Sequence, residues 1–209
     1  MKLEIIKPFG PSIVKLQIPD EIITEMNKYT DEIIKDDVQS KELDHGSKLV
    51  GNVHQEILLR TDFMQKIKWG EFLGKVCEEW VAKERNKQLK KFHIIKSWIV
   101  RQFKNEYNPV HFHSGHISGV GYLKVPNSLG ENPQKNKKYN NNGKIELIHG
   151  SKQFLSGSSM NITPEVGYFY FFPHYLMHTV YPFFETEEER RSISFNALID
   201  EKIFNVYTN

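Results

Sequence analysis

The order of apolar and polar positions divides the chain into two halves of different character. In the first half, residues 11–18 form a short run typical of a β-strand. Apolar residues then recur at helical spacing over residues 20–34, which predicts a helix. A second and longer helix is predicted over residues 62–80, where the apolar side chains fall near one face. Residues 38–60 are polar and follow neither period, so no element is assigned to them.

From Phe92 onward the pattern changes to short β-rich runs separated by turn residues. These runs read HIIKSWIVRQF, HISGVGYLKVP, GKIELIHG, EVGYFYFFP, HTVYPF and RRSISFNALI. Many short strands at fairly even spacing favour a sandwich or a barrel. Residues 127–143 are rich in Asn, Lys and Gly, which predicts a surface loop. We therefore expect one mainly β domain over residues 1–209 (α+β), with a helix-rich part at 1–91 and a β core at 92–199.

Composition and charge narrow the functional classes without choosing one. Of the 209 residues, 39% are hydrophobic and 26% are charged, as in ordinary soluble domains. The net charge of +2 makes no electrostatic case for nucleic acid or an anionic membrane. The N-terminal residues contain no apolar run long enough for a signal peptide or membrane span. Cys77 is the single cysteine, predicted to be a buried core residue, and its isolation agrees with a reducing, cytoplasmic setting.

Three of the nine histidines suggest a metal site. His111 and His113 form an H-x-H pair, and on an extended segment residues i and i+2 point to the same face. His178 begins another strand-like run, and a barrel could bring it opposite the pair. Three ligands on one face would leave positions open for other molecules on an iron ion. The alternative is three ordinary hydrogen-bonded histidines. Further candidates for a supporting or surface role are His116, His149 and His174.

The last strand-like run separates polar from apolar residues. The polar set is Arg190, Ser192, Ser194 and Asn196, and the apolar set alternates with it. The polar face meets either solvent, as on a half-exposed edge strand, or a polar cavity. In a cavity, Arg190 could grip a carboxylate through two parallel hydrogen bonds, and Ser192 would add a hydroxyl on the same face.

Five segments together carry a family resemblance. They are NPVHFHSG (108–115), SGVGYLKVP (118–126), PEVGYFYFFP (164–173), HTVYP (178–182) and ERRSISFN (189–196). In order and spacing the chain resembles the 2-oxoglutarate- and iron(II)-dependent oxygenases related to prolyl hydroxylases. The resemblance covers residues 92–199 and implies a double-stranded β-helix with N-terminal helices packed outside.

The resemblance also implies roles for individual residues. His111, His113 and His178 would bind Fe(II), and Arg190 with Ser192 would bind the distal carboxylate of 2-oxoglutarate. Two further residues would line the co-substrate pocket, unless they are ordinary core tyrosines: Tyr122 and Tyr107. The implied activity is a dioxygenase that consumes O2 and hydroxylates an unidentified protein side chain or small molecule, with release of succinate and CO2. The 127–143 loop would be either a lid over this site or a passive segment.

One position departs from the family's commonest pattern, which is His-x-Asp. Here His113 occupies the acidic position, so the metal would carry one more positive charge. A carboxylate such as Glu106 or Glu146 could instead complete the ligand set. Two other functions stay open on the residues alone, namely a three-histidine metal dioxygenase that does not use 2-oxoglutarate and a non-enzymatic β-sandwich binding module. Exposed strand edges could also pair two copies into a homodimer.

Overall fold

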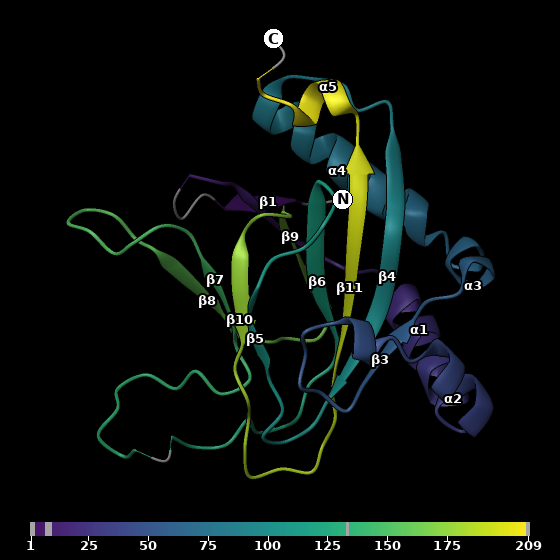
Figure 1. The fold of residues 1–209 in the computed structure, drawn as a ribbon, viewed down its shortest axis with the longest axis vertical. Coiled ribbons are helices and arrows are strands. Elements are labelled where there is room, and N and C mark those ends of the chain that lie inside the picture. The colour runs from purple at the N-terminus through teal and green to yellow at the C-terminus, as the bar shows by residue number, and fades with distance from the viewer. Residues whose placement is uncertain (1–2, 7–9, 133, 208–209) are drawn as a thin grey trace.

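Two antiparallel β-sheets face each other in the computed structural model, which describes residues 3–6, 10–132 and 134–207 (Figure 1). The large sheet has the order β1-β2-β9-β6-β11-β4-β3 and the small sheet the order β5-β10-β7-β8. The strands of the large sheet are β1 (Glu4–Ile6), β2 (Ile13–Gln17), β9 (Tyr168–Pro173), β6 (Ile117–Lys124), β11 (Arg190–Ile199), β4 (Phe92–Gln102) and β3 (Gln55–Leu58). Those of the small sheet are β5 (Asn108–His111), β10 (Met177–Val180), β7 (Ile145–Ile148) and β8 (Ser159–Ile162). This architecture is the expected double-stranded β-helix.

The helices are α1 (Asp20–Ile33), α2 (Asp37–Leu43), the short 3-10 helix η1 (Gly46–Lys48), α3 (Thr61–Lys66), α4 (Trp69–Arg85) and α5 (Glu201–Phe204). The two longest, α1 and α4, cover the outer face of the large sheet, on the side away from the small sheet (Figure 1). None of the helices in the described part of the chain is long and apolar enough to cross a membrane. The amphipathic faces of α1 and α4 supply most of the helical residues that pack on the sheet.

Alternation along the strands of the large sheet creates two apolar cores. On β9, Phe169 and Phe171 belong to the core beneath the helices, whereas Tyr170 and Phe172 belong to the core between the sheets. The neighbouring strand β6 carries glycine where the aromatic rings lie closest. A Cβ atom at Gly119 would lie 2.5 Å from a ring carbon of Phe195, so a larger residue there would displace that ring.

The structure corrects the prediction of one long helix from residue 62. The chain breaks between α3 and α4 at Lys68, which adopts a left-handed backbone conformation with φ of 54°. The break turns Trp69 into the core, where its ring stacks on Phe169 with centroids 5.6 Å apart. Burial of a large aromatic side chain thus outweighs continuation of the helical period.

The first 91 residues contribute strands as well as helices. β2 pairs with β9 at one side of the large sheet, and β3 pairs with β4 at the other. The segment 38–60, which matched no period, contains all of α2 except its first residue, together with the whole of η1 and β3. The described residues of the 127–143 loop form no helix or strand, and hydrogen bonds such as that from Gly143 N to Pro182 O (2.9 Å) anchor its end.

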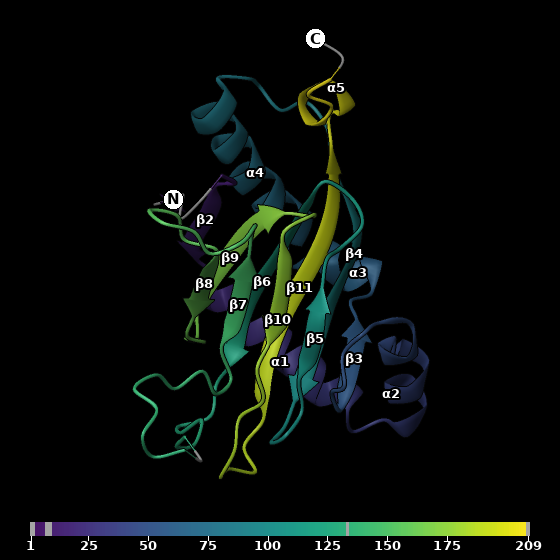
Figure 2. The same cartoon turned by 60° about the vertical axis from the view of Figure 1, so that its left-hand side comes forward.

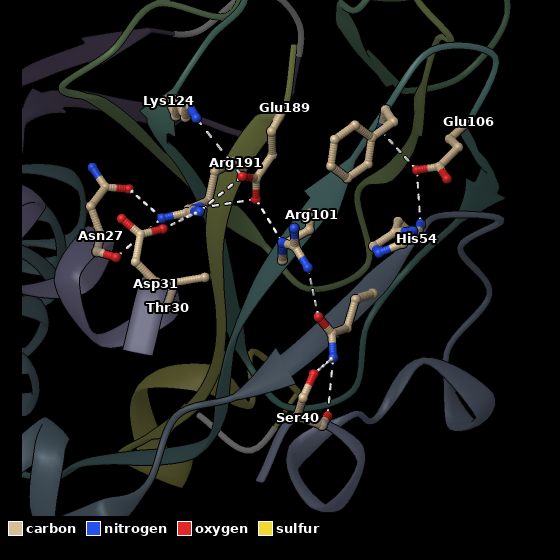
Figure 3. A network of polar contacts seen from close by, with 12 residues as sticks. Asn27, Thr30, Asp31, Ser40, His54, Arg101, Glu106, Lys124, Glu189 and Arg191 are labelled. Carbon is tan, nitrogen blue, oxygen red and sulfur yellow. Dashed lines mark hydrogen bonds and ion pairs between the residues drawn. The ribbon is translucent and has the colours of Figure 1, made fainter. Parts of the chain in front are cut away.

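A buried network of charges ties α1 to the large sheet (Figure 3). Arg191 on β11 is 2% exposed and donates hydrogen bonds to Glu189 and Asp31, each over 2.8 Å. Glu189 also accepts a hydrogen bond from Arg101 on β4 (2.8 Å). Burial raises the pKa of Glu189, but the hydrogen bonds and charges of Arg191 and Arg101 outweigh it and hold that pKa below its ordinary value. The carboxylate is therefore ionised and neutralised.

Replacement of the central carboxylate should destabilise the fold. We expect Glu189→Gln to lower the free energy of unfolding by ~3 kcal/mol at pH 7, because it leaves two arginines without their shared buried partner. The effect should shrink as the pH falls below the ordinary carboxyl range, where wild-type Glu189 also becomes protonated. Urea unfolding followed by circular dichroism would measure it. Glu79→Gln removes a solvent-accessible pair with Lys83 on α4 and should change stability by less than ~1 kcal/mol. Equal losses in the two variants would contradict the role of the network.

Candidate metal centre and adjoining cavity

Strand pairing in the small sheet brings three histidines together. β5 and β10 run antiparallel, with His111 directly opposite His178. His113 follows β5 by two residues, and its ring lies 4.9 Å from that of His178 and 5.0 Å from that of His111, centroid to centroid. One ligand nitrogen from each histidine lies within 4.8 Å of the other two. The H-x-H pair and the distant histidine thus form one cluster.

Backbone carbonyls orient two of the three imidazole rings. His111 Nδ1 lies 2.7 Å from Pro109 O, and His178 Nδ1 lies 2.9 Å from Leu176 O. Because a carbonyl oxygen only accepts, each Nδ1 carries the proton and each Nε2 keeps a free lone pair. Such partners are typical of metal-binding histidines. His174 supports the third ligand candidate, since its main-chain oxygen and its ring both hydrogen-bond the backbone of His113 (3.0 Å each).

Burial keeps the cluster uncharged at neutral pH. Burial, followed by the charges of His178 and His111, lowers the pKa of His113 to about 2. Burial and the charge of His111 lower the pKa of His178 to about 3. The pKa of His111 is also lowered, mainly by burial. Neutral imidazoles are the form that binds metal ions, so protons compete little for these nitrogens near pH 7.

The spacing of the nitrogens fits a common metal ion. His113 Nε2 and His178 Nε2 are 3.1 Å apart. Two nitrogens bound at right angles to one ion, with metal–nitrogen bonds of ~2.1 Å, would be ~3.0 Å apart. Three histidines on one side of an ion leave open positions, as the facial triads of non-haem iron enzymes do.

The two carboxylates considered as substitutes for a histidine are engaged elsewhere. Glu106 accepts hydrogen bonds from the backbone N–H groups of His54 and Phe103, each at 2.8 Å (Figure 3). Glu146 on β7 accepts a hydrogen bond from the Tyr181 hydroxyl. Among the described residues, the group of possible metal ligands at this place consists of the three histidines and includes no carboxylate.

The polar face of β11 meets a cavity rather than solvent. The cavity has a volume of about 280 Å³ and lies between the two sheets. Its lining includes the three histidines and the whole polar set of β11, namely Arg190, Ser192, Ser194 and Asn196. The apolar residues that alternate with them pack beneath the helices. Strand alternation thus directs Arg190 and Ser192 toward the histidine cluster, and Arg191 away from it.

Arg190 is buried without a counter-ion. It is 2% exposed, and its Nη1 donates to Gly143 O over 2.8 Å, whereas its Nε has no partner among the described residues. No carboxylate of the described residues acts on it, and burial lowers its pKa below the ordinary arginine value. Its neighbour Arg191 is equally buried but bound to two carboxylates. A guanidinium in this state has unused hydrogen-bond donors available for an anionic ligand.

The two tyrosines differ in their relation to this arginine. Tyr122 on β6 is completely buried, and the Arg190 guanidinium carbon lies 5.7 Å from the centre of its ring. Its hydroxyl has no hydrogen-bond partner among the described residues. Tyr107 is 42% exposed and pairs through its backbone with Asn52. Neither tyrosine is among the residues that line the cavity. The structure therefore brings Tyr122, but not Tyr107, to Arg190.

The remaining histidine candidates lie outside the cluster. His116 accepts a hydrogen bond from the backbone of Ile199 at Nδ1 and stacks on Phe204 of α5, with ring centroids 3.7 Å apart. His149 follows the end of β7. His174, in contrast, contacts a cluster histidine directly, through its two hydrogen bonds to the backbone of His113.

Sequence reasoning missed a second group of cavity residues from β3 and β4. Glu56 lies in the segment that matched no period, and the strand that positions it is four residues long. Lys96, Trp98 and Val100 alternate along β4, a signal that they share a face. The sequence does not show whether that shared face meets the cavity, because this depends on which sheet packs over it.

Known proteins were compared with this chain by sequence and by structure. Residues 96–196 match the family model described as "Putative 2OG-Fe(II) oxygenase". No curated protein matches the sequence. A prolyl-4-hydroxylase of Pseudomonas putida aligns with a TM-score of 0.58 at 12% identity, over 90% of this chain and 91% of that one.

Two further structures have similar folds. The prolyl hydroxylase of Trichoplax adhaerens, solved with a hypoxia-inducible-factor peptide fragment, has a TM-score of 0.57 at 11% identity over 94% of this chain and 87% of its own. The epimerase SnoN, solved with Fe3+, α-ketoglutarate and nogalamycin RO, has a TM-score of 0.57 at 12% identity over 89% and 78%. At these identities the likeness shows the shared double-stranded β-helix fold.

Residues 96–196 of this chain thus match the 2-oxoglutarate- and iron(II)-dependent oxygenase family. Iron(II) and 2-oxoglutarate are the cofactors of this family, and the three-histidine cluster of this chain could hold the metal.

We expect the protein to bind one divalent metal ion at the cluster. His178→Ala should reduce the affinity by more than the ~10–100-fold that loss of a supporting hydrogen bond costs, because it removes a ligand itself. Anaerobic calorimetric titration with Fe(II) would measure the stoichiometry and affinity. His93→Ala changes an exposed histidine on β4 and should leave both unchanged. Stoichiometric binding by a folded His178→Ala variant would exclude the cluster as the metal site.

Proposed function

We propose that this protein is an iron(II)- and 2-oxoglutarate-dependent dioxygenase that hydroxylates its substrate, with His111, His113 and His178 as the iron ligands. The observation that carries the proposal is Arg190, a buried guanidinium without a counter-ion in the cavity that also contains the three histidines. A ligand with a carboxylate at each end could bind a metal ion held by the histidines through one end and Arg190 through the other. The match of residues 96–196 to the 2-oxoglutarate-dependent oxygenase family supports 2-oxoglutarate as that ligand.

Arg190 is the residue we assign to the distal carboxylate of 2-oxoglutarate. Its Nε–H and the hydroxyl of Tyr122 are both buried and without a hydrogen-bond partner among the described residues, and the guanidinium carbon lies 5.7 Å from the centre of the Tyr122 ring. A carboxylate could accept from both, and the Ser192 hydroxyl on the same face of β11 could add a third hydrogen bond. The buried positive charge would thereby gain the partner that it lacks.

When bound, iron and 2-oxoglutarate supply the oxidising chemistry, in which O2 and 2-oxoglutarate are converted to CO2 and succinate while a substrate C–H bond becomes C–OH. The protein's residues orient and shield the reactants. Phe172, Val180 and Ile145 form an apolar part of the cavity wall, which would keep water from the reacting atoms. Described residues of the 127–143 loop are not part of the cavity lining, so we assign that loop no role as a lid.

The all-histidine ligand set is compatible with this reaction. Three neutral ligands would leave the full charge of the ion in the cavity, and a dianionic co-substrate offsets it. A three-histidine dioxygenase that uses no 2-oxoglutarate would have no use for a second uncompensated cation at Arg190. The guanidinium therefore favours the 2-oxoglutarate-dependent reaction.

Replacement of Arg190 should separate co-substrate binding from metal binding. We expect Arg190→Met to weaken 2-oxoglutarate binding by about 100-fold, which corresponds to ~3 kcal/mol for lost charge-assisted hydrogen bonds. Anaerobic calorimetric titration of 2-oxoglutarate into the Fe(II)-loaded protein would give the affinity. Succinate formation in air, measured by NMR, should fall in parallel.

Two controls make this result specific. Arg85→Met changes an exposed arginine at the end of α4 and should leave 2-oxoglutarate affinity unchanged. Fe(II) affinity should be the same in Arg190→Met and the wild type, since Arg190 is not a ligand candidate. A wild-type protein that binds Fe(II) stoichiometrically but not 2-oxoglutarate would contradict the proposal and favour a metal enzyme of another kind.

A further inference from the structure

One part of the cavity lies toward β3, away from Arg190. Figure 2 shows the small sheet in front of the large one, with β5 on the side of β3. We call this part the β3-side subsite, and its residues are Glu56, Trp98 and Val100 on the wall with Val50 and Phe112 at the exposed rim. Glu56 pairs with Val100, which pairs with Ser192 of β11. Because neighbouring strands lie ~4.8 Å apart and β4 lies between β3 and β11, the main chains of Glu56 and Ser192 are about 10 Å apart.

Glu56 is a buried carboxylate without a counter-ion. It is 1% exposed, and its Oε2 has no hydrogen-bond partner among the described residues. Burial and the charge of Asp44 raise the pKa of Glu56 to about 7, although a hydrogen bond from Trp98 acts in the opposite direction. The other buried carboxylate of the described residues, Glu189, is held by Arg101 and Arg191. Glu56 is thus the acidic counterpart of Arg190 within one cavity.

The surroundings of Glu56 favour a cationic ligand. Trp98, 3% exposed, contributes an aromatic ring to the same wall, and indole rings attract cations through their faces. Two lysines also belong to the lining of the cavity, Lys48 and Lys96. The Lys96 Nζ donates to His45 Nε2 over 3.2 Å, and Lys96 lies four positions along β4 from Val100, which is ~13 Å of extended chain. Neither lysine is among the causes of the Glu56 pKa.

We propose that the substrate carries a protonated aliphatic amine and that Glu56 binds this amine beside the indole of Trp98. This inference rests on the proposed oxygenase function and names the substrate class for it.

Trp98 also relates the amine site to the metal site. Its ring makes an edge contact with His113, with centroids 5.7 Å apart, and its side chain acts to lower the pKa of Glu56 on the same cavity wall. A substrate with its amine at Glu56 would extend along the indole to reach the histidine cluster. The carbon that is oxidised would therefore lie about the width of an indole away from the amine nitrogen of the substrate. A chain of several carbons would join the two. The exposed rim residues Val50 and Phe112 could contact the apolar part of that chain.

Probes that differ only in charge would test the amine site. Protein loaded with Ni(II) and 2-oxoglutarate under anaerobic conditions would be titrated with n-pentylamine, 1-pentanol and pentanoate by calorimetry. We expect the ammonium probe to bind at least 10-fold more tightly than the alcohol, and pentanoate to bind least. Glu56→Gln, which keeps the shape and removes the charge, should abolish the preference. Glu165→Gln, at an exposed glutamate before β9, should retain it.

The outcomes distinguish this inference from the proposed function. Wild-type protein that binds 2-oxoglutarate but shows no preference for pentylamine, or none that Glu56→Gln removes, would overturn the amine site alone. Failure to bind 2-oxoglutarate would overturn the oxygenase proposal instead. Undetectable binding of pentylamine at millimolar concentration would also count against the amine site.

Stability provides a second readout for Glu56→Gln. The pKa of Glu56 is raised on folding, so the folded state binds its proton more tightly than the unfolded chain. Ionisation therefore costs wild-type stability as the pH rises from the ordinary carboxyl value toward about 7. We expect the melting temperature of Glu56→Gln to equal or exceed that of the wild type above this range, in the absence of an amine. A variant less stable than the wild type at pH 8 would mean that Glu56 has a structural partner.

Discussion

Side chains on a β-strand point alternately to its two faces, and on β11 this alternation places two adjacent arginines in different environments. Arg191 points toward α1 and meets Asp31 and Glu189, so its charge is neutralised within the fold. Arg190 points between the two sheets and meets no carboxylate of the described chain. Both are equally buried, so counter-ions and not exposure distinguish the arginine that holds the fold from the one available to a ligand.

The cavity contains two opposite charges that do not pair with each other. Arg190 and Glu56 belong to different strands of the large sheet, and the register keeps them apart. Leaving a charged group buried and unpaired lowers the stability of the ligand-free protein. The apolar cores on both sides of the large sheet offset that loss, because they extend over most of its length. Buried charges normally have counter-ions, and two exceptions in one cavity are the pattern expected of a binding site.

Much of the fold could be predicted because strand and helix periods are local. The helix at α1 follows from its helical period, and β4, β6, β7, β9, β10 and β11 follow from β-rich runs bounded by turn residues. The break at Lys68 could not be predicted in this way, since it depends on the contact of Trp69 with Phe169 from a strand 100 residues later. The short strand β3 was missed because four residues carry too little periodicity, and its pairing with β4 forms it.

For the site, the sequence by itself determined which residues share a face. It placed His111 with His113, and Arg190 with Ser192, because a two-residue period needs no tertiary information. Only the tertiary structure decided what those faces meet: His178 opposite His111 across β5 and β10, a cavity instead of solvent over β11, and Glu56 within the same enclosure. Such contacts join residues far apart in the chain, so sheet pairing and packing create them and no local pattern encodes them.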